Sequence, residues 1–223
     1  MKTIFVTGLT RGLGKSIAEV FAANNWNVCG IYSNKSEHVE NAWQCDVRDR
    51  EKLQEVFKEV VNKCGGVDVL VNNAAINKNQ LARDTTEADW NEVIGVNLTG
   101  IFNVCKEVVP LMRKKGGHII NISSVSGLKG REGQCHYVAS KAGVIGFSKS
   151  LAREVACWNI KVNVILPGYM KTNMLDEKYI ARAESENLLG KINTTQDAAG
   201  FIYQLTQTDF ISGQVFNLDS RIL

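Results

Sequence analysis

Short apolar runs alternate with longer helical segments along the whole chain of 223 residues, and this alternation constrains the fold more than any other feature. Most of the runs are continuously apolar, as in strands that are buried on both faces of a parallel sheet. The predicted strands are Thr3–Thr7, Val28–Tyr32, Ala42–Asp46, Val67–Asn72, His118–Ser123, Lys161–Leu166 and Gln214–Leu218.

The segments between these runs have helical periodicity. In Glu51–Lys63, for example, apolar residues recur at the spacing of a helix with one buried face. This alternation predicts an α/β fold: a single doubly wound, Rossmann-like parallel seven-stranded sheet with helices on both faces, in one domain over residues 1–223. The predicted helices are Lys15–Ala23, Glu51–Lys63, Trp90–Lys114, Tyr137–Ala156 and a last helix that begins at Thr194.

One polar segment, Asn173–Asn193, breaks the alternation just after a strand, and its sequence favours no regular structure. Ligands of open parallel sheets bind beyond the carboxyl ends of the strands. We therefore expect a substrate lid at about residues 173–193.

The balance of charges and the cysteine pattern exclude several classes of protein. Because 26 Lys and Arg face 23 Asp and Glu, the net charge is only +3, which does not predict a nucleic-acid-binding protein. The cysteines lack close ligand pairs, so no metal site is predicted, and we expect reduced core thiols. No apolar run is long enough to cross a membrane, and Met1 leads almost directly into a strand, so we expect no membrane partner and a cytoplasmic location. The six cysteines are Cys29, Cys45, Cys64, Cys105, Cys135 and Cys157.

A glycine-rich turn follows the first predicted strand and opens the first helix. Gly8, Gly12 and Gly14 have the spacing GxxxGxG, which differs from the commoner GxGxxG. Glycines allow a ligand to approach the backbone closely, and a helix N-terminus offers free N–H groups to a phosphate. The turn therefore predicts a nucleotide site.

The end of the second strand indicates which nucleotide binds. An acidic residue there would hold a ribose 2′-hydroxyl, but the chain reads Ser33-Asn34-Lys35. Arg11 lies in the glycine-rich turn, and basic side chains favour a 2′-phosphate. We predict NADP(H) rather than NAD(H); the alternative is that Arg11 and Lys35 are solvated surface charges.

Tyr137 and Lys141 are four residues apart in a predicted helix and so share one face. A cation at ~4 Å in a partly buried site stabilises a phenolate by roughly 4 kcal/mol, which would lower the phenol pKa by about three units. Such a tyrosine could act as a general acid–base catalyst near neutral pH.

Two further polar residues occur in apolar surroundings. Ser124 follows the strand His118–Ser123, where its hydroxyl can project toward a cofactor. Asn97 interrupts an apolar stretch of the helix Trp90–Lys114, and asparagine is unfavourable in a helix interior. Asn97 is either a packing residue bonded to the backbone or a residue that holds a water molecule in a proton relay.

Together these motifs resemble the short-chain dehydrogenase/reductase family over nearly the whole chain. Within the family the chain is most similar to the β-ketoacyl carrier-protein reductases, through Asn72–Asn77, Trp90–Ile94 and Lys149–Val155. The motifs, in order, are Thr7-Gly8-x3-Gly12-x-Gly14, Asn72-Asn73-Ala74-Ala75, Asn97, Ser124, Tyr137-x3-Lys141 and Pro167-Gly168-x3-Thr172.

The resemblance implies roles for the matching residues. Tyr137 would be the general acid–base, Lys141 would lower its pKa and bond the nicotinamide ribose, and Ser124 would polarise the substrate carbonyl. Asn97 would hold the relay water. The implied cofactor-binding residues are Gly8, Thr10, Arg11, Gly12, Leu13, Gly14, Ser33, Asn34, Asp46, Val47, Asn73, Ala74, Tyr137, Lys141, Pro167, Gly168 and Thr172.

The implied reaction is hydride transfer from NADPH to a 3-oxoacyl thioester, a step of fatty acid biosynthesis, in a homotetramer built on the helices Trp90–Lys114 and Tyr137–Ala156. An acyl carrier protein is acidic, so its reductase needs basic residues beside the cleft. The candidates are Arg113, Lys114, Lys115, Lys149 and Arg153. Acyl-CoA, another small ketone or alcohol, and a catalytically idle binding role remain as alternatives.

The chain departs from the family pattern at three places. Ala75 stands where the family usually has glycine, and a shorter stretch from Ser33 to Asp46 predicts a truncated crossover helix. The C-terminus reads Asp219-Ser220-Arg221, where relatives often have an Asp-Gly-Gly turn.

Overall fold

A seven-stranded parallel sheet forms the centre of the computed structural model, which describes residues 1–33, 40–170 and 177–221. The strand order is β3-β2-β1-β4-β5-β6-β7, so the predicted fold class is confirmed. Asn34, Lys35 and Thr172 lie outside the described residues. The strands are β1 (Thr3–Thr7), β2 (Asn27–Tyr32), β3 (Ala42–Gln44), β4 (Val69–Asn72), β5 (Gly117–Ile122), β6 (Ile160–Leu166) and β7 (Val215–Asn217).

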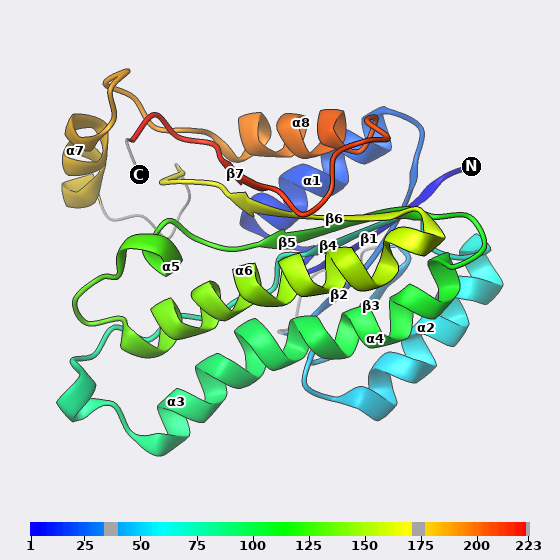
Figure 1. Ribbon diagram of the computed structural model, residues 1–223, viewed down its shortest axis with the longest axis horizontal. Helices are drawn as coiled ribbons and strands as arrows, with labels where there is room; N and C mark the ends of the chain where they lie inside the picture. Colours follow the sequence, from blue (N-terminus) through cyan, green and yellow to red (C-terminus); the bar gives the residue numbers. More distant parts are fainter. Residues whose placement is uncertain (34–39, 171–176, 222–223) are drawn as a thin grey trace.

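Helices cover both faces of this sheet (Figure 1). α1 (Gly12–Ala23) and α8 (Thr195–Leu205) pack together on one face, and α2 (Arg50–Cys64), α4 (Gly100–Met112) and α6 (Cys135–Val155) cover the other. In β1, Ile4 and Val6 join the core under α1, whereas Phe5 joins the core under α2 and α4. Both faces of the strand are therefore buried, which explains its continuously apolar sequence.

The predicted helix Trp90–Lys114 is longer and less regular than expected. It comprises α3 (Glu87–Ile94), one π-helical turn (Gly95–Thr99) and α4. It begins earlier because the Thr86 side chain caps α3 by accepting from the Asp89 N–H at 3.1 Å, and it ends at Met112, before Gly116 at φ +74°.

By length and composition alone, this stretch, Glu87–Met112, could cross a membrane, so the expectation of no such segment was wrong. Less than half of its most apolar window is buried, while Val93, Val104 and Val108 pack into the domain core. Two large apolar side chains on its outer face, Trp90 and Phe102, remain exposed among polar residues such as Asn91 and Lys106.

The segment Asn173–Asn193 contains a helix that its polar sequence did not predict, α7 (Glu177–Glu186). In Figure 1, α7 stands apart from the two helical layers, at the left-hand end of the sheet. The remaining short elements are two 3₁₀ turns (Ala82–Asp84 and Ala156–Trp158) and α5 (Ser126–Lys129).

Candidate active site

The glycine-rich turn lies at the carboxyl end of β1, beside the point where the strand order reverses between β1 and β4. Gly8 has φ +72°, a conformation that favours glycine, and its N–H donates to the Ile31 carbonyl of β2 at 2.8 Å. The Thr7 hydroxyl accepts from the backbone N–H groups of Asn73 (3.0 Å) and Ala74 (2.9 Å). The turn is therefore joined to both neighbouring strands.

Gly14 leaves space that any side chain would fill. A Cβ atom at this position would lie 2.1 Å from the Gly8 carbonyl oxygen and 2.7 Å from Asn73 Nδ2. α1 begins at Gly12, earlier than the predicted Lys15, so Gly12, Leu13 and Gly14 form its first turn. Arg11 is the N-cap residue of α1, and its side chain makes no capping hydrogen bond with the described residues. The first N–H groups of this helix are therefore free for a phosphate. These features fit a dinucleotide.

Three of the predicted cofactor-binding residues, Ser33, Asp46 and Val47, follow the carboxyl ends of β2 and β3. The Ser33 carbonyl accepts from the Gln44 side chain, and the Asp46 carboxylate is 2.6 Å from the Arg48 guanidinium, which lowers the pKa of Asp46. Val47 is buried against Gly100, where an added Cβ would come within 2.4 Å of Val47 Cγ2. The Asp46 carboxylate is thus already paired, whereas the Arg11 side chain is exposed.

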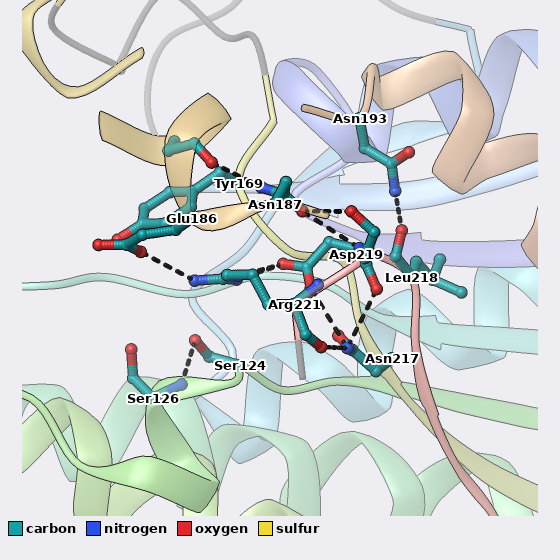
Figure 2. Close-up of polar contacts among 12 residues, drawn as sticks. Ser124, Ser126, Tyr169, Glu186, Asn187, Asn193, Asn217, Leu218, Asp219 and Arg221 are labelled. Atoms are coloured by element: carbon teal, nitrogen blue, oxygen red, sulfur yellow. Dashed lines mark hydrogen bonds and ion pairs between the residues drawn. The ribbon is translucent and has the colours of Figure 1, made fainter. Parts of the chain in front are cut away.

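Ser124 follows β5, and Tyr137 and Lys141 lie in the first half of α6, which returns across that end of the strand. The Ser124 oxygen accepts from the backbone N–H of Ser126 at 3.2 Å, and the Ser124 hydroxyl hydrogen-bonds the Tyr137 side chain. Figure 2 shows this contact between Ser124 and Ser126. The Lys141 nitrogen lies 5.7 Å from the centre of the Tyr137 ring. The structure therefore brings the predicted catalytic groups together.

Lys141 is one of the largest fully buried side chains, with 2% of its surface exposed. Its ammonium donates to the Ile122 carbonyl at 2.9 Å. Burial disfavours the charged form and lowers the pKa of Lys141 to about 8.

The expected lowering of the Tyr137 pKa by Lys141 is wrong for this structure. Burial raises the pKa of Tyr137, and hydrogen bonding by Ser124 and the positive charge of Arg131 only partly oppose this. The physical reason is that Lys141 directs its ammonium to a backbone carbonyl while its own charge is destabilised by burial. Tyr137 is accordingly a protonated phenol at neutral pH.

Asn97 is completely buried in the π-helical turn. Its Oδ1 accepts from the Ile76 N–H at 2.9 Å, and its Nδ2 donates to the Ile76 carbonyl (2.9 Å) and to the Ser140 hydroxyl (3.1 Å). Ser140 in turn donates to the Tyr137 carbonyl at 2.7 Å. Asn97 therefore links the loop after β4 to the helix that carries Tyr137.

Several residues beside this site were not predicted. The Tyr169 ring stacks on the Arg221 guanidinium (4.4 Å), and the Tyr169 hydroxyl accepts from Arg131 at 3.2 Å. Arg221 also pairs with the buried Asp219 and lies 4.0 Å from Glu186 of α7 (Figure 2). The only sequence signal was the atypical C-terminus.

The same C-terminal segment contacts the residues that follow α7. Ser220 donates from its backbone N–H (3.1 Å) and its hydroxyl (3.2 Å) to Asn187 Oδ1, and the Leu189 N–H donates to the Ser220 hydroxyl. Gly168, with φ +76°, packs against Asp219, where an added Cβ would lie 2.5 Å from Oδ2. The tail thus joins the turn after β6 to the α7 region.

The basic residues predicted beside the cleft lie elsewhere. α4 ends at Met112 before β5 begins, so Arg113, Lys114 and Lys115 lie at the amino end of β5, about 20 Å from Ser124. Figure 1 shows the end of α4 and α5 at opposite sides of the molecule. Arg113 stacks on Trp158 at 4.3 Å. Lys149 and Arg153 occupy the corresponding end of α6, because both helices run antiparallel to the strands.

Ala75 is compatible with its place in the turn after β4. It is exposed, and the non-glycine residues with positive φ in the described part of the chain are Asn25, Asn41 and Asn159. An added β-carbon therefore costs little there.

Comparison with known proteins identifies a nicotinamide-dependent oxidoreductase. A family model for short chain dehydrogenases matches residues 2–183, and the chain belongs to this family. The chain is 39% identical to the 3-oxoacyl-[acyl-carrier-protein] reductase FabG of Thermotoga maritima over an alignment of 240 positions, which covers 100% of this chain and 98% of the relative. The enzyme of the same name from Staphylococcus aureus is 41% identical, with 78% of this chain and 77% of the relative covered.

Among solved structures, the ligand-free aldohexose dehydrogenase of Thermoplasma acidophilum superposes with a TM-score of 0.92 at 27% identity. The superposition covers 98% of this chain and 92% of the dehydrogenase.

Proposed function

We propose that this protein reduces 3-oxoacyl thioesters, carried by acyl carrier protein, to 3-hydroxyacyl thioesters with NADPH, as a step of fatty acid biosynthesis. The observation that carries the proposal is the grouping of Ser124, Tyr137 and Lys141 at the carboxyl end of β5 in a chain that matches 3-oxoacyl-[acyl-carrier-protein] reductases over most of its length. When bound, the reduced nicotinamide supplies a hydride.

Ser124 and Tyr137 act on the substrate oxygen. When substrate is present, the Ser124 hydroxyl donates a hydrogen bond to the ketone oxygen, where negative charge develops, in place of its bond to Tyr137. Tyr137 then donates the proton that completes the alcohol. The raised pKa of Tyr137 keeps this proton in place at neutral pH, which suits reduction better than oxidation.

Lys141 and Asn97 support these two residues. The Lys141 ammonium has three donors, of which one is used by Ile122, so two remain for the nicotinamide ribose and for Tyr137. Asn97 orients the first turn of α6 through Ser140, and the relay water that the family resemblance implies belongs beside it.

The preference for NADPH rests on charge around the adenine ribose. The chain has no acid directly after β2, and the exposed Arg11 lies beside the glycine-rich turn. A guanidinium there attracts a 2′-phosphate, whereas a carboxylate would repel it. The cofactor contacts proposed for Asn73, Ala74, Pro167 and Gly168 follow from their places in loops at the same edge of the sheet.

Arg131 is the basic residue that we assign to the mouth of the site. It is exposed, it holds the Tyr169 hydroxyl, and its charge acts on Tyr137. It therefore replaces Arg113, Lys114 and Lys115 as the cation that an acidic carrier protein would meet when it delivers substrate to the same subunit.

Two large exposed side chains on α3 and α4 support the proposed assembly into a homotetramer. Trp90 is 41% exposed and Phe102 is 46% exposed, and Phe102 makes an edge-on contact with Phe147 of α6. Burial of this face between subunits would remove it from water. We place the assembled enzyme in the cytoplasm, with the α7 region as the lid of the substrate site.

The direct test is loss of NADPH absorbance with acetoacetyl-CoA, a 3-oxoacyl group on acyl carrier protein, and simple ketones. We expect the carrier-bound substrate to react fastest, with Arg131→Glu raising its KM and Lys115→Glu leaving it unchanged. Tyr137→Phe should remove nearly all turnover while NADPH still binds, and Lys141→Ala should weaken both turnover and binding. If no thioester reacts, the proposal is wrong.

A second candidate is oxidation of a sugar or other small alcohol. It is favoured by the structural similarity to an aldohexose dehydrogenase. A panel of aldohexoses with NADP⁺ or NAD⁺ tests it, and turnover of sugars without turnover of thioesters would establish it in place of the first proposal.

A further inference from the structure

Two cysteines that are 35 positions apart in the sequence have their sulfur atoms in contact. Cys29 Sγ and Cys64 Sγ are 3.0 Å apart. A disulfide bond requires about 2.04 Å, so the atoms need to approach by only about 1 Å. The other four cysteines have oxygen or nitrogen partners instead.

The backbone around both cysteines holds them in this arrangement. Cys29 lies within β2 with no exposed surface, on the side of the sheet that α2 covers. Cys64 is the last residue of α2 and is partly exposed. Gly65 ends the helix at φ +75°, and the Cys64 carbonyl accepts from the Thr3 hydroxyl at 3.3 Å. Neither position depends on a long or flexible side chain.

We propose that Cys29 and Cys64 form a reversible intramolecular disulfide when the protein meets a low-molecular-weight disulfide such as oxidised glutathione. This is a redox modification site that lies outside the catalytic groups.

The exchange requires two steps. The Cys64 thiolate attacks one sulfur of the oxidant, which forms a mixed disulfide and releases one small thiolate. The Cys29 thiolate then attacks Cys64 Sγ, which forms the Cys29–Cys64 bond and releases the second small thiolate. The two protons lost by the cysteines pass to the two released thiolates, so one oxidant molecule becomes two thiols and two electrons leave the protein.

Exposure determines the order of these steps. The oxidant can reach Cys64 but not Cys29, which is enclosed by the core. Burial also raises the pKa of Cys29, so this thiol keeps its proton until a reactive sulfur stands beside it. Cys45 and Cys105 are buried like Cys29, but their contacts are to Asp46 and Asn72.

The new bond would join β2 to the end of α2 while leaving the site intact. Cys64 lies at the amino end of β1, because its carbonyl contacts Thr3, and the glycine-rich turn lies at the other end of the same strand. We therefore expect oxidation to preserve NADPH binding. A closed loop of this length restricts the unfolded chain, so the midpoint of thermal unfolding should rise by about 5–10 °C.

The experiment uses the full chain with Cys157→Ser, which removes the exposed thiol that would otherwise form a mixed disulfide. The protein is incubated with oxidised glutathione, alkylated with iodoacetamide and digested with trypsin without reduction. We expect the peptides Ser16–Lys35 and Cys64–Lys78 to be joined, two fewer free thiols, and the higher unfolding midpoint, all reversed by dithiothreitol.

The matched control adds Cys64→Ser at the partly exposed position, where folding is least at risk, and it should give neither the joined peptides nor the higher midpoint. Absence of the joined peptides from the folded Cys157→Ser protein would overturn the proposal. Glutathione retained on Cys64, or equal joining of Cys64 to Cys45 or Cys105, would overturn it as well.

Discussion

The buried Lys141 ammonium makes the substitution Lys141→Met informative about stability as well as activity. Lys141 is 2% exposed, and none of its described contacts is a carboxylate. Burial lowers its pKa from 10.5 to about 8. This lowering corresponds to a cost of about 3 kcal/mol for keeping the charge in the folded chain. Methionine fills a similar volume without a charge, but it leaves the Ile122 carbonyl without this donor, which costs about 1 kcal/mol. At pH 7 the variant should therefore be more stable by about 2 kcal/mol and should lack activity.

The pH dependence follows from the same pKa. Below pH 8 the Lys141 ammonium is charged in both the folded and the unfolded chain, so folding bears the full free-energy cost of burying this charge. Between pH 8 and 10.5 the folded chain has already lost the proton that the unfolded chain still holds, and the cost disappears. The free energy of unfolding of the wild type therefore rises with pH because of Lys141, whereas that of Lys141→Met lacks this rise. The variant should cease to be more stable than the wild type near pH 9 to 10.

Urea unfolding followed by circular dichroism at pH 7, 8, 9 and 10 measures both effects. Lys149→Met is the matched control, because Lys149 is exposed on the same helix, and its stability should follow that of the wild type at every pH. A Lys141→Met protein that is less stable than the wild type at pH 7, or an advantage that does not shrink with pH, would refute the reasoning.

Three other substitutions, one of them with a matched control, test the cofactor loop and the C-terminal segment. Gly14→Ala should abolish NADPH binding, measured by fluorescence titration, because the added Cβ would lie 2.1 Å from a backbone oxygen. Its control is Gly200→Ala in α8, where a Cβ meets no described atom within 4 Å; this variant should bind NADPH normally and gain up to about 1 kcal/mol in stability. Arg11→Ala should weaken NADPH at least tenfold more than NADH, and equal weakening would disprove the 2′-phosphate contact. Arg221→Ala should lower the free energy of unfolding by about 2–3 kcal/mol, because it removes the cation that faces the buried Asp219 carboxylate. It should also speed tryptic cleavage around α7, and unchanged cleavage would show that the tail does not hold this region.

The features of this protein that depend only on residues adjacent in the sequence could be predicted from the sequence. The strands follow from apolar runs, and the turn at Gly8–Gly14 follows from glycines between a strand and a helix. Tyr137 and Lys141 share a helix face because of their spacing alone. These features are local, so the sequence pattern carries them.

The π-helical turn at Asn97 and the helix α7 could not be predicted in the same way. Asn97 is stabilised by Ile76 and Ser140, which are 21 and 43 positions away, so its local sequence shows only an unfavourable residue. α7 has a polar sequence, and it contacts the C-terminal segment through Glu186 and Arg221. In both cases distant contacts override the local preference.

By itself, then, the amino-acid sequence determined the sheet, the glycine-rich turn and the shared face of Tyr137 and Lys141, because each depends on periodicity over a few residues. Only the tertiary structure decided the direction of the Lys141 ammonium, the meeting of Arg131 and Arg221 at Tyr169, and the placement of the Arg113–Lys115 cluster at the far end of the sheet. The physical reason is that burial, charge and contact depend on what the rest of the chain places around a residue, and no short stretch of sequence contains that information.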